Sequence, residues 1–144
     1  MTFFLISAII ILLFLLGFFD LKYLILPDLL LVFFLLFTLF LKGLESIFMS
    51  LHGIFTFFTI SLGLKVSYHL WRKIDGLGWG DVKLLTLSGC WVPFEEIAFF
   101  LTIIGGCGFL LGKYWRFSGR GERFPLGALI VGVLGVWILV QGIE

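Results

Sequence analysis

The run Thr2–Phe19, TFFLISAIIILLFLLGFF, has no charged residue and is followed directly by Asp20. About 20 apolar residues cross the hydrocarbon core of a bilayer as a helix, so this run predicts a membrane-spanning helix that ends near Asp20. No Lys or Arg precedes the run, and no A-x-A-like cleavage site follows it. We therefore expect the run to be a permanent part of the fold rather than a signal peptide.

The rest of the chain has the same character, because 61% of its 144 residues are hydrophobic and only 13% are charged. A soluble domain of this size buries only about 70% of the surface that its unfolded chain exposes, which would leave too much apolar surface in water. The composition therefore predicts an integral membrane protein whose partner is the lipid bilayer. With a net charge of only +1 the chain lacks the basic surface typical of nucleic-acid-binding proteins, and we expect no such partner.

Three further charge-free runs have the length of a span or nearly so: Ser46–Leu64, Ile97–Gly112 and Phe124–Ile143. Two shorter runs, Leu29–Leu41 and Leu84–Phe94, can cross only if the charged residues beside them lie at or inside the membrane boundary. We expect an all-α integral membrane protein with a bundle of six transmembrane helices. Re-entrant segments are the alternative for the second and fourth helices.

The distribution of basic residues predicts the orientation. Six spans place the connecting loops alternately on two sides, and nine of the ten basic residues then share one side, with Lys42 alone on the other. By the positive-inside rule the nine-residue side is cytoplasmic and both termini are outside. No linker, repeat or low-complexity tail divides the chain, so residues 1–144 are expected to form a single membrane domain. The nine basic residues are Lys22, Lys65, Arg72, Lys73, Lys83, Lys113, Arg116, Arg120 and Arg123.

Two aspartates stand where a simple membrane anchor is not expected. Asp20 ends the first run, where Lys, Arg, Trp or Tyr is the more typical residue. Asp81 follows Gly76-x-Gly78-x-Gly80 and precedes an apolar run. These glycines allow positive φ and close backbone approach, while their spacing is not that of a phosphate-binding loop. A solvated stop residue for Asp20 and a helix N-cap for Asp81 are the structural alternatives.

The six-helix topology brings Asp20 and Asp81 to the same membrane face. Two carboxylates a few ångströms apart near a low-dielectric boundary cannot both ionise easily, so they share a proton. This is the acid–base arrangement of aspartic proteases. The sequence offers no Ser-His-Asp or Cys-His alternative, and His52 and His69 are expected to be interfacial residues.

The two cysteines, Cys90 and Cys107, lie inside apolar runs without a C-x-x-C motif or a nearby His. They support neither a disulfide framework nor a zinc site, and we expect no metal. Both are expected to pack in the core as small hydrophobic residues. Asp28 follows Pro27 at the start of the second predicted helix, where an acidic side chain can cap free N–H groups.

With these segments in place, the chain resembles the bacterial prepilin peptidases, which are GxGD-type intramembrane aspartyl proteases. The segment Asp20–Asp28, DLKYLILPD, looks like the family's D-x(6)-P-[DN] segment. The segment Gly76–Leu84, GLGWGDVKL, looks like its G-[ML]-G-x-G-D-x-K-L segment. Residues 124–127, FPLG, are similar to a proline-phenylalanine-glycine segment that opens the family's last helix, although the residue order differs.

This resemblance implies that Asp20 and Asp81 are the catalytic pair and that Gly78 and Gly80 shape the loop that presents Asp81. Lys83 matches a motif lysine, which either biases the ionisation of the pair or anchors the helix at the membrane surface. The supporting positions of the two motifs are Pro27, Asp28 and Lys83.

The resemblance also implies a substrate and a location. The substrate would be the precursor of a type IV pilin or a type II secretion pseudopilin, whose leader is cut at the cytoplasmic face of the bacterial inner membrane. Many members carry a further cytoplasmic region with paired C-x-x-C motifs and methylate the new amino terminus. This chain has no such cysteines, so we expect cleavage without methylation and no cofactor.

Two other classes of function remain open from the sequence. A non-catalytic membrane assembly or scaffold protein would use Gly105, Gly106, Gly108 and Gly112 as helix-packing surfaces. A proton-coupled transporter subunit would also place carboxylates in a small helical bundle. A transporter is expected to carry carboxylates deep in its spans or internal repeats, and neither is apparent here.

Overall fold

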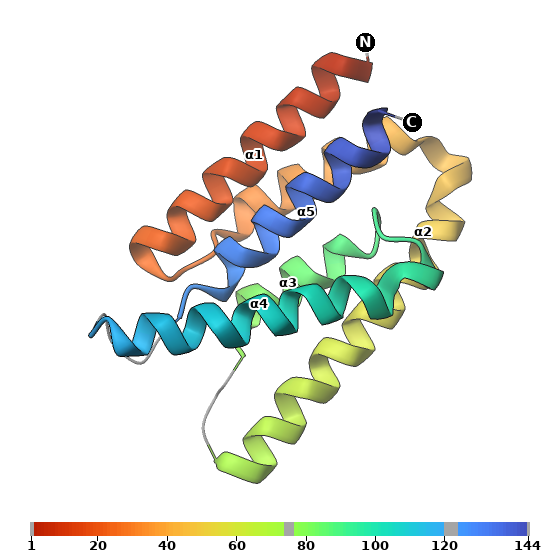
Figure 1. Cartoon of the computed structure of the whole chain (residues 1–144). Helices are drawn as coiled ribbons and strands as arrows, with labels where there is room; N and C mark the ends of the chain where they lie inside the picture. Colours follow the sequence, from red (N-terminus) through yellow and green to blue (C-terminus); the bar gives the residue numbers. More distant parts are fainter. Residues whose placement is uncertain (1, 74–76, 120–123, 144) are drawn as a thin grey trace.

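The computed structural model describes residues 2–73, 77–119 and 124–143, and over these residues the chain is all-helical (Figure 1). This confirms the predicted all-α class. Four of the six predicted helices correspond to α1, α3, α4 and α5, and the other two are joined in α2. The elements are α1 (Thr2–Tyr23), α2 (Asp28–Arg72), α3 (Trp79–Ser88), the short 3-10 helix η1 (Phe94–Glu96), α4 (Ile97–Phe117) and α5 (Leu126–Ile143).

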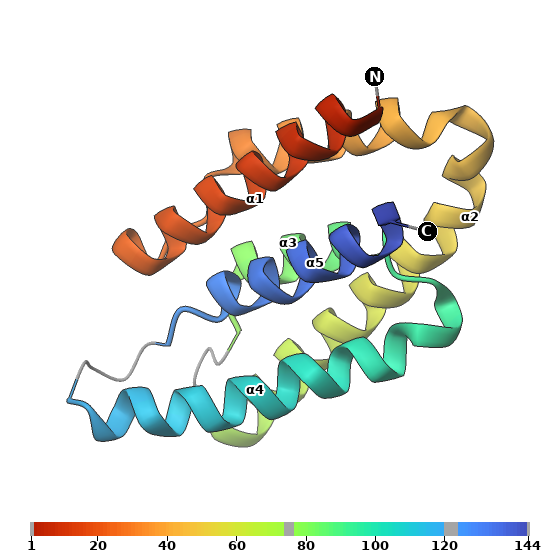
Figure 2. The same ribbon diagram turned by 45° about the horizontal axis from the view of Figure 1, so that its top comes forward.

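Helix α2 combines the second and third predicted helices and bends sharply at Gly43 (Figures 1 and 2). Gly43 has φ 71° and ψ 170°, a conformation that residues with a side chain rarely adopt. No atom of the described residues lies within 4 Å of the place where a Cβ would stand. The backbone conformation, rather than a close contact, therefore accounts for the glycine at the bend.

Within the described residues, two helical segments have the length and apolarity of a membrane span, Phe4–Tyr23 and Phe94–Phe117. Leu126–Gln141 is also an apolar helix but is shorter. Helix α3 has only ten residues and is about 15 Å long. The six-span arrangement therefore stays a prediction, with α3 too short to cross a bilayer by itself.

The buried core draws on all the helices, and one part of it lies between α1 and α5, which pack side by side (Figures 1 and 2). On each helix the buried residues lie three to four positions apart and so form one face turned toward the neighbouring helix. Gly17 of α1 completes the contact, because a Cβ there would lie 3.3 Å from Val131 of α5. The fully buried residues of the two faces are Ile9, Leu13, Leu16, Ile130, Leu134 and Ile138.

Aromatic rings attach α4 to the rest of the bundle. The ring of Phe100 makes edge-to-face contacts with Phe57 of α2 and with Trp137 of α5, at centroid distances of 5.7 and 5.5 Å. Phe57 and Phe100 are fully buried. This three-ring cluster fixes the first turn of α4. Such ring pairs contribute about 0.5–1.5 kcal/mol beyond the burial of their surface.

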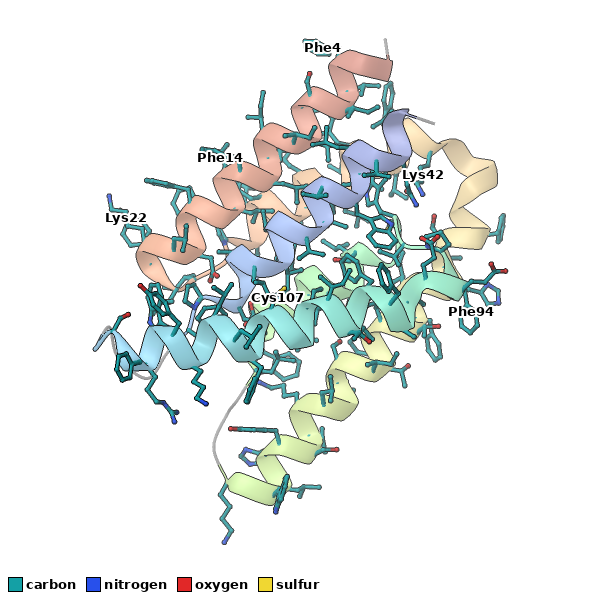
Figure 3. All side chains as sticks on the ribbon, viewed as in Figure 1. Phe4, Phe14, Lys22, Lys42, Phe94 and Cys107 are labelled. Atoms are coloured by element: carbon teal, nitrogen blue, oxygen red, sulfur yellow. The ribbon has the colours of Figure 1, made fainter. Side chains whose placement is uncertain are left out.

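The outer surface of the bundle is strongly apolar. Phe4 and Phe14 of α1 project away from the bundle (Figure 3) and are about three-quarters exposed. Phe94, the first residue of η1, is exposed as well. Cys107 lies on the outer face of α4, so the prediction that it packs in the core is wrong, whereas Cys90 is buried as predicted. In a long apolar helix a small residue can face either the lipid or a neighbouring helix. The apolar run therefore could not show which way Cys107 faces.

The predicted glycine packing surface on α4 is formed only in part. Among the described residues, nothing lies within 4 Å of a Cβ at Gly105 or Gly106, whereas Gly108 faces Leu126. A tighter contact joins Gly53 of α2 to Gly89, directly after α3, where a Cβ on either glycine would collide with the backbone of the other.

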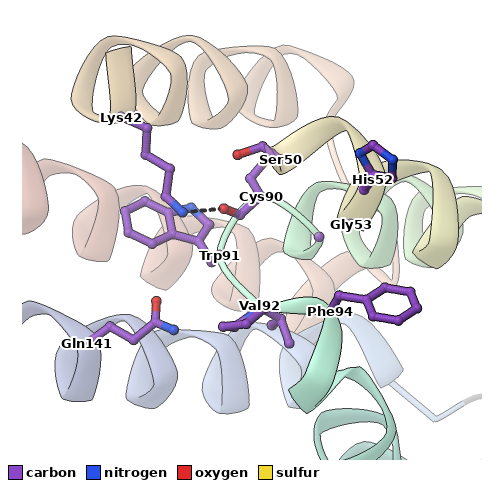
Figure 4. Close-up of a pocket in the computed structure, with 11 residues that line it drawn as sticks. Lys42, Ser50, His52, Gly53, Cys90, Trp91, Val92, Phe94 and Gln141 are labelled. Carbon is purple, nitrogen blue, oxygen red and sulfur yellow. Dashed lines mark hydrogen bonds between the residues drawn. The ribbon is translucent and has the colours of Figure 1, made fainter. Parts of the chain in front are cut away.

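Near the ends of α1 and α5 that carry the chain termini, Lys42 holds the turn that follows α3 (Figure 4). Its Nζ donates a hydrogen bond to the carbonyl oxygen of Cys90 and lies 4.9 Å from the ring centroid of Trp91. Trp91 Nε1 in turn donates to Thr38 Oγ1 at 3.2 Å. Lys42, Cys90 and Trp91 line a cavity of about 790 Å³, which Gln141 of α5 also lines.

Candidate active site

Asp20 stands in the last turn of α1 and points into the bundle. It continues the inward face of Ile9, Leu13 and Leu16, and it is only 5% exposed. The helix stops just after it, where Leu24 takes a left-handed conformation with φ 54° and its N–H donates to the Asp20 carbonyl oxygen at 2.9 Å.

The carboxylate of Asp20 reaches the N-terminus of α5. Its Oδ2 accepts a hydrogen bond from the backbone N–H of Ala128 at 2.7 Å. The first N–H groups of a helix have no partner within that helix and carry a partial positive charge, so they favour an anionic side chain. The end of α1 and the start of α5 are therefore joined through one buried acidic group.

Asp81 stands in the first turn of α3, three residues after the N-cap Gly78. The structural alternative for Asp81, that of a helix N-cap, therefore does not apply, because Gly78 holds that position. A Cβ at Gly78 would lie 3.3 Å from Asp81 Oδ2, so a side chain there would crowd the carboxylate. At Gly80 a Cβ would lie 3.0 Å from Leu26 Cβ. The two glycines therefore allow α3 to start close to both its own carboxylate and the α1–α2 connection.

The expected positive φ does not occur at these two glycines. Gly78 has φ −67°, and Gly80 is not among the residues with positive φ. Close approach is the reason for glycine at both positions. Gly76, the first residue of the motif, lies outside the described residues.

Gly127, in the first turn of α5, brings the two carboxylates together. A Cβ at this position would lie 2.9 Å from Asp20 Oδ2 and 3.0 Å from Asp81 Oδ1. The two oxygens are therefore no further apart than the sum of these distances, which is within the range of about 4–6 Å where neighbouring charges shift each other's ionisation strongly. Asp20 and Asp81 face each other across the bare backbone of Gly127.

The surroundings of Asp81 make its carboxyl group a weak acid. Asp81 lies outside the two segments with the length of a membrane span. Burial, and then the charge of Asp20, raise the pKa of Asp81 to about 6, against the opposing effects of a backbone hydrogen bond from Gly78 and the charge of Lys65. A carboxyl group with this pKa can hold or release a proton near neutral pH.

The supporting motif residues form a separate contact. Lys83 Nζ lies 2.7 Å from Asp28 Oδ1, and both side chains are at least half exposed. This ion pair joins the starts of α2 and α3. Pro27 is the N-cap of α2, and no side-chain capping bond accompanies it. Lys83 is not among the groups that shift the pKa of Asp81, so Asp28 rather than the carboxylate pair is its partner.

Two residues of the site were not singled out from the sequence, Gly127 and Lys65. Gly127 lies within the FPLG segment, and its place two residues after Pro125, at the start of the last apolar run, was the available signal. Lys65 was counted only as one of nine basic residues. His52 and His69 are exposed, and within the described ranges no group of three or more His, Cys, Asp or Glu side chains could hold a metal ion.

Fold and site together define an all-helical protein with a pair of facing aspartates at one end of its bundle. The model of the type IV leader peptidase family matches residues 7–140, a range that includes Asp20, Asp81 and Gly127. The chain belongs to this family of peptidases, which confirms the resemblance stated from its two motifs. No curated protein and no solved structure matches it significantly.

Proposed function

We propose that the protein is an aspartic endopeptidase that removes the leader peptide of type IV prepilins or type II secretion pseudopilins, with Asp20 and Asp81 as its catalytic pair. The observation that carries this proposal is the convergence of both carboxylates on Gly127, each about 3 Å from the place of the missing Cβ. Membership of the type IV leader peptidase family supports the reaction class and a prepilin-type substrate.

The chemistry follows from a pair that shares one proton. The ionised carboxylate removes a proton from water while the protonated one donates a hydrogen bond to the scissile carbonyl. The water oxygen bonds to the carbonyl carbon, the C–N bond breaks, and the leaving amine takes up a proton. Asp81, with a pKa of about 6, is suited to this exchange because neither of its protonation states is strongly disfavoured near neutral pH.

The position of the pair suits a substrate that is half soluble and half membrane-embedded. We place the protein in the bacterial inner membrane, with the carboxylates at the cytoplasmic face and both termini outside. Two helical segments of span length and the exposed apolar surface support a membrane location. The two chain ends lie together in the bundle (Figures 1 and 2), as this topology requires. A site at the boundary can reach the bond between a basic leader and an apolar helix.

Co-expression with a candidate prepilin tests the proposal. The native protein is expected to shorten the prepilin by its leader, and Asp20→Asn and Asp81→Asn are expected to leave it uncut. Asp28→Asn is the matched control, because Asp28 is an exposed carboxylate paired with Lys83 away from the facing pair. Cleavage by either site variant would reject the catalytic pair, and a correctly inserted but inert native protein would favour a scaffold function.

A further inference from the structure

Lys65 of α2 contacts the segment that leads into α3 at two points. Its Nζ donates a hydrogen bond to the carbonyl oxygen of Leu77 at 2.6 Å. The same ammonium group lies 4.8 Å from the ring centroid of Trp79, within the range of a cation–π interaction. The two contacts lie on either side of Gly78, so Lys65 fixes both neighbours of the α3 N-cap.

The start of α3 needs such a support from outside. Its N-cap is a glycine without a side chain, and Gly80 follows in the first turn. Glycine loses more conformational freedom on folding than any other residue, so this segment has little local preference for one conformation. The carboxylate of Asp81 can meet Asp20 across Gly127 only if the segment is held in place.

The charges around Asp81 are few. Asp20 of α1 adds a negative charge that raises its pKa, and Lys65 of α2 adds a positive charge that lowers it. Helix α5 also packs against α3 but has no titratable side chain between Leu126 and Ile143. On α3 itself, Lys83 is paired with Asp28. Among the described residues, Lys65 is thus the cation that acts on Asp81.

We propose that Lys65 is a positioning residue of the peptidase site: it holds residues 77–79 in the conformation that brings Asp81 to Asp20, and it supplies the positive charge that lets two carboxylates share one site. This inference rests on the proposed function. It adds to the site a residue of α2 that belongs to neither motif segment.

Lys42 provides a matched control within the same helix. It too donates from Nζ to a loop carbonyl, that of Cys90, and lies over a tryptophan ring, that of Trp91. It holds the other end of α3. Removing Lys42 therefore deletes the same kind of contact without deleting the charge that acts on Asp81.

The first test is the pH profile of leader cleavage by purified protein in detergent, for Lys65→Met, Lys65→Arg and Lys42→Met. We expect Lys65→Met to lose about 10-fold to 100-fold in kcat, with a smaller change in KM, because the reacting groups are misplaced. Its profile should move to higher pH, because loss of the positive charge raises the pKa of Asp81 further. Lys42→Met should keep the native profile.

Lys65→Arg retains the charge but replaces the compact ammonium group with a planar guanidinium. It should keep the native pH profile with a reduced kcat. A native profile for Lys65→Met, a shifted profile for Lys65→Arg, or an equal shift for Lys42→Met would each overturn the proposal.

A second measurement separates this inference from the proposed function, because it needs no substrate. The melting temperature in detergent is recorded from pH 4 to pH 8 for the native protein and Lys65→Met, each also in an Asp81→Asn background. Lys65→Met should enlarge the total loss of stability between pH 4 and pH 8 and extend it to higher pH, and only while Asp81 is present. An equal effect in the Asp81→Asn background would reject the coupling of Lys65 to Asp81, whether or not the protein cleaves prepilins.

Discussion

The two ends of α3 are held by the same kind of contact but differ in what lies beside it. At each end a lysine of α2 donates to a backbone carbonyl and lies over a tryptophan ring, at 4.8 Å for Lys65 and 4.9 Å for Lys42. Trp91, at the Lys42 end, is buried and hydrogen-bonded to Thr38, whereas Trp79 is 60% exposed.

The titratable neighbours make the difference between the two ends. Beside Lys42 stands Cys90, a free cysteine whose thiol is buried. Beside Lys65 stands Asp81, which can change its charge near neutral pH. The same kind of lysine contact therefore stabilises the turn at one end of α3 and, at the other end, lies beside a carboxyl group that can change its charge.

The largest expected contrast is between substitutions of two glycines, one beside each end of α3: Gly127 of α5 and Gly89. In Gly127→Ala the new Cβ would meet the carboxylate oxygens of Asp20 and Asp81, which are ends of side chains and can move apart. We expect a loss of cleavage of about 100-fold or more with only a small change in stability, because a displacement of about 1 Å is enough for such a loss. Cleavage kinetics and the melting temperature in detergent measure the two effects.

In Gly89→Ala the new Cβ would collide instead with the backbone of Gly53, which cannot move locally. Overpacking of this kind costs about 1–3 kcal/mol or more, so we expect a clear fall in melting temperature. The Gly89→Ala protein that stays folded should keep the native pH profile of leader cleavage. If Gly127→Ala were the less stable and Gly89→Ala the less active of the two, the distinction between the two ends of α3 would be wrong.

A second prediction concerns the pH dependence of stability at the Asp81 end. The folded-state pKa of about 6 lies above the ordinary value of about 3.9, so the folded protein binds more protons between these values and its stability falls as the pH rises through this window. Asp81→Asn removes this pH-dependent loss of stability, because asparagine does not titrate. It should raise the melting temperature at pH 7.5, and the gain should vanish near pH 4. A gain that grew toward low pH would contradict the raised pKa.

A third prediction concerns Cys90 at the opposite end. In a Cys107→Ala variant Cys90 is the remaining cysteine, and as a buried thiol it should react slowly with an alkylating reagent at pH 8. Denaturation should make the reaction fast. Rapid alkylation of the folded protein, followed by mass spectrometry, would show that this end is open rather than packed.

The smallest effect is expected for the surface ion pair. Asp28 and Lys83 are at least half exposed, and pairs of this kind contribute about 0–1 kcal/mol. Lys83→Met should therefore change the melting temperature by little and leave the pH profile of cleavage in place. A shifted profile would show that Lys83, rather than Lys65, acts on the carboxylate pair.

Much of the helical architecture followed from the apolar runs. Their lengths predicted the helices, because a charge-free run in this composition has few alternatives. They could not show that α2 continues through Gly43 as one bent element, since hydrophobicity alone does not distinguish a bend from a loop. The number of spans and the orientation stay predictions that rest on length and charge.

The candidate site was predictable where topology alone decided it. Alternating helices predicted that Asp20 and Asp81 lie at one end of the bundle, and they do face each other there. The roles of Gly127 and Lys65 depend on how closely the backbones of neighbouring helices pack. No residue spacing in the sequence indicates that packing. Lys65 is also one basic residue among several at its end of α2, so charge counting gave it no special place.

The central claim is that Asp20 and Asp81 act as one unit, and a double-variant cycle on leader cleavage tests it most directly. The kcat of purified Asp20→Asn, Asp81→Asn and the double variant is compared with that of the native protein on a peptide with a basic leader, a glycine and an apolar segment. Residues that act as a unit show losses that do not multiply, so all three variants should be reduced to the same residual rate. Substantial cleavage by either single variant, or losses that multiply in the double variant, would contradict the account.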